Sequence, residues 1–583
     1  MTDSRLTAHT RDSALARLAA SAKPGQELDI LVIGGGVTGA GIALDAVSRG
    51  LSAAVVEAQD WASGTSSRSS KLMHGGLRYL QMLDFKLVLE ALKERDLLLT
   101  EIAPHLVRPI PFLYPLRHRV FERLFVGAGI MLYDLLASAR TGKRALPFHR
   151  HLSRKALTET FPDFAKDAAV GAIEYWDANV DDARFVLTVL RTAVERGAHA
   201  ASRTQVVELT KNAAGAVDGA VLMDLETGST FTVKAKTVIS STGVWTEESQ
   251  SLAGNDGGLR VLASKGIHIV VPRDRIEGSA GLILQTSKSV LFVIPWSRYW
   301  VIGTTDTPWT EDLMNPVATA TDIDYVIAEA NKVLARPISH ADVVGTWAGL
   351  RPLLQPGTKT GTQSAKVSRE HTVASSVPGL VSIAGGKFTT YRVMAKDAVD
   401  FSLGAAAKGR PSVTEHIPLI GADGFKAAES ELRAIIDGLG WSSTMTDHLF
   451  HRYGANVRDI AEIAQNDPSL AKPLEHAPAY LRAEIVYAIT HEGALHLDDL
   501  MMRRTRMVYE YLDEAMDALP EVAELAKSVL GWSDEQAARE TELYRKRAAA
   551  DADAADQPDD ASAARVRAAA VEIVPMVALG ASS

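Results

Sequence analysis

The chain has 583 residues, of which 46% are apolar, so it can bury a large core, and its length indicates more than one structural unit. Its 62 Lys and Arg residues against 71 Asp and Glu residues give a net charge of −9, which provides no overall attraction for nucleic acid, so none is expected as a partner. The absence of cysteine excludes disulfides, thiolate metal sites, iron–sulfur clusters and a cysteinyl flavin link, and no metal site is expected.

Residues 1–27 are predicted to form an N-terminal extension. They carry scattered charges and no apolar run that resembles a signal peptide, so a cytoplasmic location is expected. No stretch of the chain approaches the roughly 20 consecutive apolar residues needed to span a bilayer.

The first regular elements form a strand, helix, strand unit. Residues 28–33 are almost continuously apolar, as in a strand buried on both faces of a parallel sheet. Residues 39–49 have helical spacing with small residues on one side, and Gly50 is placed to end that helix. Residues 52–56 are predicted to form the second strand.

The turn between the first strand and the helix carries a dinucleotide-binding pattern. It reads Gly34, Gly35, Gly36, Val37, Thr38, Gly39 and fits G-x-G-x-x-G. Gly34 permits the tight turn, Gly36 lets backbone N–H groups approach a pyrophosphate, and Gly39 allows the helix to pack closely on the strand. Glu57 ends the second strand, where it is expected to accept hydrogen bonds from the adenosine ribose and to disfavour a 2′-phosphate.

Three later segments favour FAD over NAD as the cofactor. Each is a loop rich in hydroxyl groups or glycine that can bind more of an extended cofactor. The candidate cofactor residues in them are Thr65, Ser66, Ser67, Ser69 and Lys71 after the second strand, Gly243 after a strand at 237–241, and Gly385, Gly386 and Thr389 after a strand at 380–383.

The middle of the chain is predicted to be α+β and the end helical. Residues 290–296 and 299–304 are expected to form a hairpin around Ser297 and Arg298. Residues 410–545 are predicted to form a helical domain, with helical patterns at 427–438 and 483–509. Residues 546–583 are rich in Ala and Asp, and we expect a partly disordered tail there.

Five longer runs carry a family resemblance. They are Ser69-Ser70-Lys71-Leu72-Met73-His74-Gly75-Gly76-Leu77-Arg78-Tyr79-Leu80, the run from Tyr175 to Arg184, Ile302-Gly303-Thr304-Thr305-Asp306-Thr307-Pro308, Ala348-Gly349-Leu350-Arg351-Pro352-Leu353, and Gly385-Gly386-Lys387-Phe388-Thr389-Thr390-Tyr391-Arg392. Through them the chain resembles the FAD-dependent glycerol-3-phosphate dehydrogenases, the respiratory, membrane-associated type, over most of residues 28 to about 510.

The resemblance implies an α/β FAD-binding fold of the glutathione-reductase or amino-acid-oxidase kind in residues 28–405. An antiparallel-sheet substrate domain, formed by residues of about 100–170 and 262–345, is interleaved with it, and an all-α C-terminal domain follows.

The resemblance also implies the reaction, which is oxidation of sn-glycerol 3-phosphate to dihydroxyacetone phosphate by hydride transfer from C2 to FAD N5, with a membrane quinone as electron acceptor. Five side chains are expected to line the substrate pocket: Arg78, Tyr79, Arg351, Arg369 and Lys387. Our candidate for the general base is His74, because an imidazole titrates near neutral pH, and a desolvated Lys387 is the alternative. Arg351 is expected to stabilise the developing alkoxide.

Residues 113–154 place basic residues on both sides of a short apolar patch at 124–133. This arrangement is typical of a segment that lies on a membrane, and a buried helix with solvated basic ends explains it equally well. On the first interpretation the protein is peripherally associated with the inner face of the plasma membrane. A homodimer is possible.

Three other functions stay open. A glycerol-3-phosphate oxidase would share the site and pass electrons to oxygen. An amino-acid-oxidase-like enzyme would need one or two Arg residues and a mostly apolar pocket, and three Arg and a Lys favour phosphate. In a non-enzymatic flavin scaffold, the helical domain, with its run Arg503-Arg504-Thr505-Arg506, would contact a partner or serve as a dimerisation or structural module.

Overall fold

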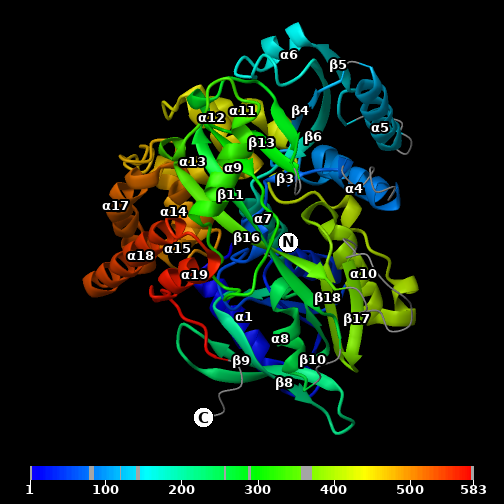
Figure 1. Cartoon of the computed structure of the whole chain (residues 1–583). Helices are drawn as coiled ribbons and strands as arrows, with labels where there is room; N and C mark the ends of the chain where they lie inside the picture. Colours follow the sequence, from blue (N-terminus) through cyan, green and yellow to red (C-terminus); the bar gives the residue numbers. More distant parts are fainter. Residues whose placement is uncertain are drawn as a thin grey trace.

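The computed structural model describes residues 3–77, 85–118, 120–138, 145–254, 258–286, 290–355 and 371–578. Two β-sheets and a helical C-terminal domain form the molecule (Figure 1). The chain contributes strands to the first sheet in three segments and to the second sheet in the two segments between them. The helical domain follows the last strand of the first sheet. The predicted architecture, an α/β unit interleaved with an antiparallel-sheet unit and followed by an all-α domain, is confirmed.

The first sheet has the strand order β17-β18-β10-β1-β2-β7. From β18 to β7 the neighbouring strands are parallel. Strands β8 and β9 extend from β10 as an antiparallel layer. The strands of this sheet are β1 (Leu28–Ile33), β2 (Ala53–Val56), β7 (His199–Ala201), β8 (Thr204–Lys211), β9 (Val217–Asp224), β10 (Thr230–Ser240), β17 (His371–Val377) and β18 (Leu380–Gly385).

Strand β1 is apolar throughout because both of its faces are covered. Ile30 and Val32 pack on the side of helices α2 (Val37–Ser48), α7 (Asp182–Glu195) and α10 (Tyr391–Leu403). Leu31 and Ile33 pack on the other side, together with α1 (Ala8–Ala20) and β8 and β9. Gly50 has a φ of +77° just after α2 and ends that helix as predicted.

The second sheet has the order β15-β11-β14-β13-β12-β4-β6-β3, with β16 paired to β11 and β5 to β6. Its pairings are antiparallel except for β12 with β4. The strands are β3 (Leu72–Met73), β4 (Arg108–Leu116), β5 (Arg150–Ser153), β6 (Gly171–Asn179), β11 (Val261–Pro272), β12 (Gly281–Gln285), β13 (Val290–Trp296), β14 (Tyr299–Gly303), β15 (Thr307–Pro308) and β16 (Gly345–Leu354). The predicted hairpin is present, since Trp296 pairs with Tyr299 across Ser297 and Arg298.

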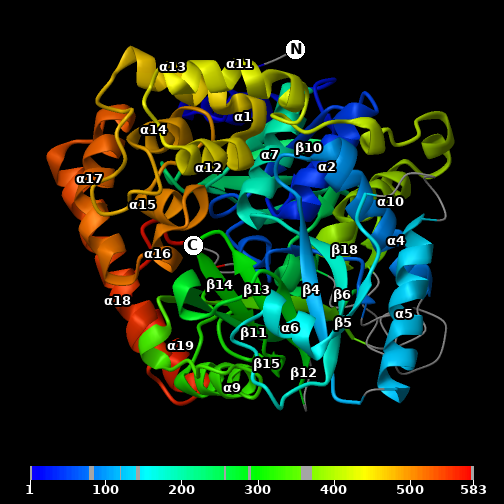
Figure 2. The same ribbon diagram turned by 90° about the horizontal axis from the view of Figure 1, so that it is seen from above.

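Helices cover the second sheet on both sides. One face packs on α9 (Ala320–Asn331) and the other on the helical domain. At the side of this sheet lie α4 (Phe85–Leu97) and α5 (Phe121–Ser138) (Figure 2). Helix α6 (Arg154–Thr160) packs on the same face as α9 through Leu157. The short helix α8 (Thr246–Ser251) follows β10. Among the described residues, none of the helices is both long and apolar enough to cross a bilayer.

The helical domain consists of α11 (Phe425–Asp437), α12 (Ser443–Tyr453), α13 (Val457–Asn466), α14 (Arg482–Thr490), α15 (Leu497–Asp499), α16 (Met507–Glu510), α17 (Leu512–Leu530) and α18 (Asp534–Ala555). The helical pattern predicted over 483–509 is broken into α14, α15, a π-helical turn (Leu500–Arg504) and α16. Gly493, with a φ of +65°, lies in the break between α14 and α15.

The basic run at 503–506 is a structural module that joins the helical domain to the first sheet. Arg504 Nη1 lies 2.7 Å from Asp60, and Arg506 Nη2 lies 2.6 Å from Asp182. Arg503 also contacts Asp60. These charges are buried, and such pairs hold only where each charge is matched. The run is therefore an internal interface within this chain.

The C-terminal tail differs from the predicted partly disordered segment. Helix α18 continues to Ala555, α19 (Asp560–Ala568) follows, and the chain is described as far as residue 578. Ion pairs of a buried arginine explain the order: Arg567 contacts Asp551 at 2.7 Å and Glu572 at 2.6 Å. These few ion pairs are enough to hold the Ala-rich tail against the helical domain.

Candidate functional site

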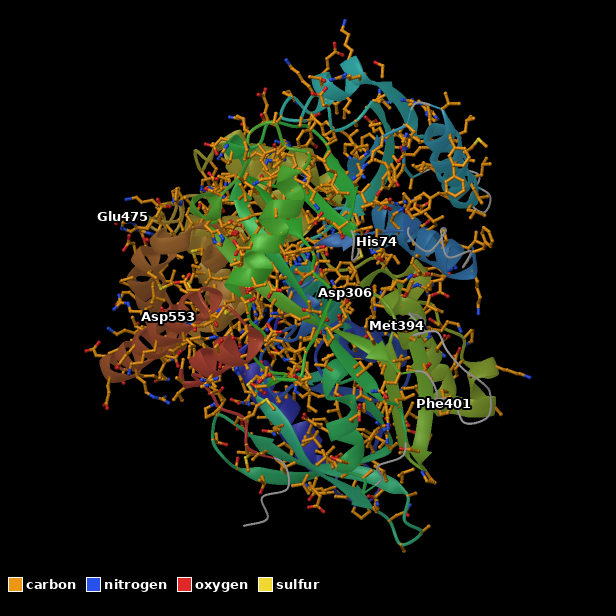
Figure 3. All side chains as sticks on the ribbon, viewed as in Figure 1. His74, Asp306, Met394, Phe401, Glu475 and Asp553 are labelled. Carbon is orange, nitrogen blue, oxygen red and sulfur yellow. The ribbon has the colours of Figure 1, made fainter. Side chains whose placement is uncertain are left out.

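A cavity of about 480 Å³ runs from the carboxyl ends of the first sheet's parallel strands to the second sheet. Most of the predicted cofactor residues line it: Gly34, Gly36, Val37, Thr38, Glu57, Thr65, Ser66, Ser69, Gly243, Gly385, Gly386 and Thr389. His74, Arg351 and Lys387 line it as well. Predicted residues from the two sheets thus share one continuous cavity. Figure 3 places His74 and Asp306, another lining residue, near the centre of the molecule.

The glycine-rich turn has the geometry that an extended dinucleotide requires. Gly34 has a φ of +105°, and a Cβ there would lie 2.9 Å from the Ser241 carbonyl oxygen. A Cβ at Gly39 would overlap the Gly34 carbonyl oxygen, so Gly39 lets α2 pack against the turn, though it does not line the cavity. Helix α2 begins at Val37, so its N-terminus and the partial positive charge there face the cavity.

Glu57 stands at the end of β2, where the ribose carboxylate of such a site is expected. Its carboxylate accepts hydrogen bonds from Gly35 N at 2.7 Å and Gln59 N at 2.8 Å. Burial raises the pKa of Glu57, while these two N–H groups work against that rise. The acid is thereby fixed beside the turn, and the residues present fit FAD.

The loop after β2 divides into residues that face the cavity and residues that support it. The Ser66 hydroxyl accepts from Val37 N at 3.0 Å, and the Thr65 hydroxyl donates to the Leu350 carbonyl at 2.6 Å. Lys71, predicted as a cofactor ligand, instead lies buried and donates to Asp182 and to the Ser67 carbonyl, both at 2.7 Å. Neither Ser67 nor Lys71 lines the cavity. The ion pair with Asp182 holds Lys71 within the protein.

Arg351 is held in place from the neighbouring strand ends. Its Nη2 donates to the Thr304 hydroxyl at 3.0 Å and to the Thr305 carbonyl at 3.0 Å. Its Nη1 lies 3.4 Å from Asp306. Gly266 lies on β11, where it pairs with Gly349 of β16. A Cβ at Gly266 would overlap Arg351 Nη2. Gly266 therefore leaves the space in which the guanidinium crosses the sheet.

His74 is fixed through its own backbone and through the next residue. The Thr389 hydroxyl donates to the His74 carbonyl at 3.3 Å, and Gly75 N donates to Asp177 at 3.1 Å. Asp177 also accepts from Arg95 at 2.8 Å and from Tyr133 at 2.9 Å. This buried cluster positions the loop that carries the imidazole.

Sequence reasoning missed His268 on β11. It lines the cavity, its Nε2 lies 2.8 Å from the Ser70 hydroxyl, and its ring stacks on Trp347 at 5.2 Å. Burial lowers the pKa of His268 well below its usual value, and Arg351 and Lys71 add to this effect. The imidazole is thus neutral near pH 7. One polar residue within the apolar run 267–271 was the available signal.

Thr304 and Asp306 belong to the run from Ile302 to Pro308, and both line the cavity beside Arg351. Three predicted substrate residues, Arg78, Tyr79 and Arg369, lie outside the described residues.

Two family matches divide the chain at the same place as the fold does. Residues 29–392 match the family described as FAD dependent oxidoreductase. Residues 412–537 match the C-terminal domain of alpha-glycerophosphate oxidase. The cofactor of this protein is accordingly FAD.

Individual relatives cover nearly the whole chain. A glycerol-3-phosphate dehydrogenase of Mycobacterium leprae is 47% identical over 94% of this chain and 92% of its own. The human mitochondrial glycerol-3-phosphate dehydrogenase is 38% identical over 89% of this chain and 73% of its own. The solved glycerol-3-phosphate dehydrogenase of Bacillus halodurans, in complex with FAD, is 30% identical with a TM-score of 0.76 and covers 93% of this chain and 97% of its own. The chain belongs to the family of FAD-dependent glycerol-3-phosphate dehydrogenases.

Proposed function

We propose that this enzyme oxidises sn-glycerol 3-phosphate to dihydroxyacetone phosphate and passes the electrons to a membrane quinone. One observation carries the substrate proposal. The cavity that the dinucleotide turn opens into is also lined by the cationic side chains Arg351 and Lys387. Fixed cations match the oxygens of a phosphate monoester, and the relatives named above are glycerol-3-phosphate dehydrogenases.

The proposed cofactor contacts follow from the lining. Gly34, Gly36 and the first turn of α2 hold the pyrophosphate with backbone N–H groups, and Glu57 accepts from the ribose hydroxyls. Gly385, Gly386 and Thr389 line the cavity close in sequence to Lys387, and the Thr389 hydroxyl donates to the His74 carbonyl. In this proposal the reactive part of the cofactor lies beside these residues.

In the reaction, bound FAD supplies the acceptor for the hydride that leaves C2 of the substrate. His74 takes the proton of the C2 hydroxyl, so that the C–O bond becomes a carbonyl. Arg351 donates to the oxygen as negative charge develops on it, because a guanidinium held by Thr304 and Thr305 needs no reorientation during the step. Lys387 binds substrate, together with Arg78, Tyr79 and Arg369.

Helix α5 supports a place at a membrane surface. Four large apolar side chains at its start are strongly exposed: Val120 (68%), Phe121 (79%), Leu124 (68%) and Phe125 (69%). Ile130 and Tyr133 of the same helix are buried, so the helix has one face in the protein and one outside. Figure 2 shows α5 at the edge of the molecule, on the far side from α17 and α18.

An apolar face beside basic residues is the composition of an interfacial helix. Arg117, His118 and Arg123 lie next to the exposed side chains. A quinone dissolved in the same bilayer is then near the protein, and a chain with no Cys has no iron–sulfur relay to carry electrons farther. We therefore propose a peripheral location on the inner face of the plasma membrane.

The test of the reaction is a panel of polyols with and without phosphate, assayed with a soluble quinone under air. Glycerol 3-phosphate is expected to give dihydroxyacetone phosphate and one reduced quinone for each substrate, and glycerol is expected to be inactive. Equal rates for both compounds would contradict the phosphate site. Hydrogen peroxide in place of reduced quinone would identify an oxidase.

A further inference from the structure

The C-terminal tail reaches the cofactor cavity. Met576 is one of the lining residues, together with Ala58, Gln59 and Gln205. The Gln59 side-chain amide lies 3.6 Å from the Met576 sulfur. The tail thus forms part of the wall of the cavity that the dinucleotide turn opens into.

A paired amide contact fixes the tail at this point. Gln205 Nε2 donates to the Val577 carbonyl at 2.9 Å, and Val577 N donates to Gln205 Oε1 at 2.9 Å. The side chain of Gln205 therefore pairs with the tail backbone as a neighbouring strand would. Both hydrogen bonds lie at the edge of β8, where the tail descends from α19 toward β8 and β9 (Figure 1).

This contact lies at the Glu57 end of the cavity. Thr204, next to Gln205, donates its backbone N–H to the Glu57 carbonyl at 2.8 Å. Arg351 and Lys387 lie on β16 and after β18. Because Glu57 marks the adenosine ribose, the tail covers the adenosine end and leaves the reacting end to other residues.

The tail is anchored firmly before it reaches the cavity. Glu572 lies 3.2 Å from Arg547 of α18 and 2.6 Å from Arg567 of α19, and it accepts from Asn315 at 3.0 Å. Ile573 is 4% exposed and packs with the helical domain. A segment held this way loses little further conformational entropy when it closes over a ligand.

The tail lies outside both matched family models, which end at residues 392 and 537. We propose that residues 575–578 form an adenosine strap, a part of the FAD site in which Met576 closes the adenosine end and the Gln205–Val577 amide pair holds the strap shut. A thioether is flexible and polarisable, so it suits the face of an aromatic base. The strap retains FAD by slowing its release.

The experiment compares two shortened holoenzymes. The first ends after Val574, so it loses the strap and keeps Glu572 and Ile573, and the control ends after Ala578. FAD release after dilution is followed by the rise in fluorescence of free FAD, and the dissociation constant is measured by adding FAD to each apoprotein. We expect release from the chain that ends at Val574 to be on the order of tenfold faster, which corresponds to about 1.4 kcal/mol. Equal release rates would overturn the proposal.

A full-length double variant, Gln59→Ala with Met576→Ala, covers the case in which the shorter chain does not fold. It removes both side chains of the 3.6 Å contact and leaves the backbone anchor intact. Faster FAD release is again expected, and release at the wild-type rate would refute the strap. These measurements need no substrate, so they do not depend on the proposed reaction.

Discussion

Tyr133 of α5 donates a hydrogen bond of 2.9 Å to Asp177 of β6, and the same carboxylate oxygen accepts from Gly75 N at 3.1 Å. Through this one oxygen, the helix whose outer face is proposed to meet the membrane supports the loop of His74. The Tyr133 hydroxyl also fills the space in which a Cβ at Gly75 would lie.

The substitution Gly75→Ala is expected to displace the His74 loop. The new methyl group would overlap the Tyr133 hydroxyl and the Leu92 side chain, and both of these residues are buried. A displacement of about 1 Å costs on the order of 100-fold in turnover, so kcat should fall by roughly that factor while FAD stays bound. Gly409→Ala is the control, because a Cβ there meets nothing within 4 Å. Unchanged kcat in Gly75→Ala would show that the loop position does not matter.

Binding to anionic vesicles should depend on the apolar face of α5. Phe121 and Phe125 stack on each other with ring centroids 6.4 Å apart, and both are exposed. The double variant Phe121→Ser, Phe125→Ser removes apolar area worth about 1.5–3 kcal/mol for each ring, so binding in a sedimentation assay should weaken by at least about tenfold. Phe401→Ser on α10, where the side chain is 47% exposed, is the matched control (Figure 3). Equal binding by both variants would refute a role for α5.

The parts of the site that depend on local sequence could be predicted, and those that depend on distant pairing could not. The glycines at 34, 36 and 39 act through backbone shape, which their own spacing reveals. Lys71 lies in a hydroxyl-rich loop whose composition predicts cofactor binding. In the fold it instead forms an ion pair with Asp182, which is distant in sequence. The placement of Arg504 beside Asp60 likewise joins residues far apart in sequence, so no local pattern indicates it.

The order of the C-terminal tail also could not be predicted from the local sequence. Its composition is poor in aromatic residues and resembles that of a disordered segment. What orders it is a small number of ion pairs, among them that of Arg567 with Glu572, whose partners become visible only in the folded chain.

The buried pair Arg504 and Asp60 should be essential for stability. Their side chains are 0% and 1% exposed. Arg504→Ala removes both of its hydrogen bonds to the buried Asp60 carboxylate, which among the described residues keeps only its contact with Arg503. This is expected to lower the free energy of unfolding by about 3–5 kcal/mol in urea denaturation. Arg433→Ala, which breaks an exposed pair with Glu429, should cost less than about 1 kcal/mol. A loss for Arg504→Ala no larger than that of this control would contradict the account.

Stability should also fall at alkaline pH because of His496. Burial acts against its charge, but hydrogen bonds with Glu226 and Glu540, each 2.9 Å long, outweigh this and raise the pKa of His496 to about 10. Because the pKa of His496 is higher in the folded than in the unfolded protein, its positive charge stabilises the fold. This contribution is fully present below the unfolded pKa of 6.5 and is lost as the pH rises toward the folded pKa of about 10.

The expected slope from this one group is about 1.4 kcal/mol per pH unit between these two values. Urea unfolding at pH 7 and pH 9 should therefore show a smaller decrease in stability for His496→Gln than for the wild type. His416→Gln, at an exposed position, should keep the wild-type decrease. Parallel pH profiles for wild type and His496→Gln would rule out the charged imidazole.

The proposed reaction is tested most simply by the absorbance of the enzyme-bound flavin when sn-glycerol 3-phosphate is added without oxygen. If the cationic end of the cavity holds this ester for oxidation by FAD, the yellow band of the oxidised flavin should disappear within the mixing time or shortly after. Dithionite provides the reference for full reduction. A band that persists in excess glycerol 3-phosphate and bleaches only with dithionite would refute the proposed oxidation of this substrate.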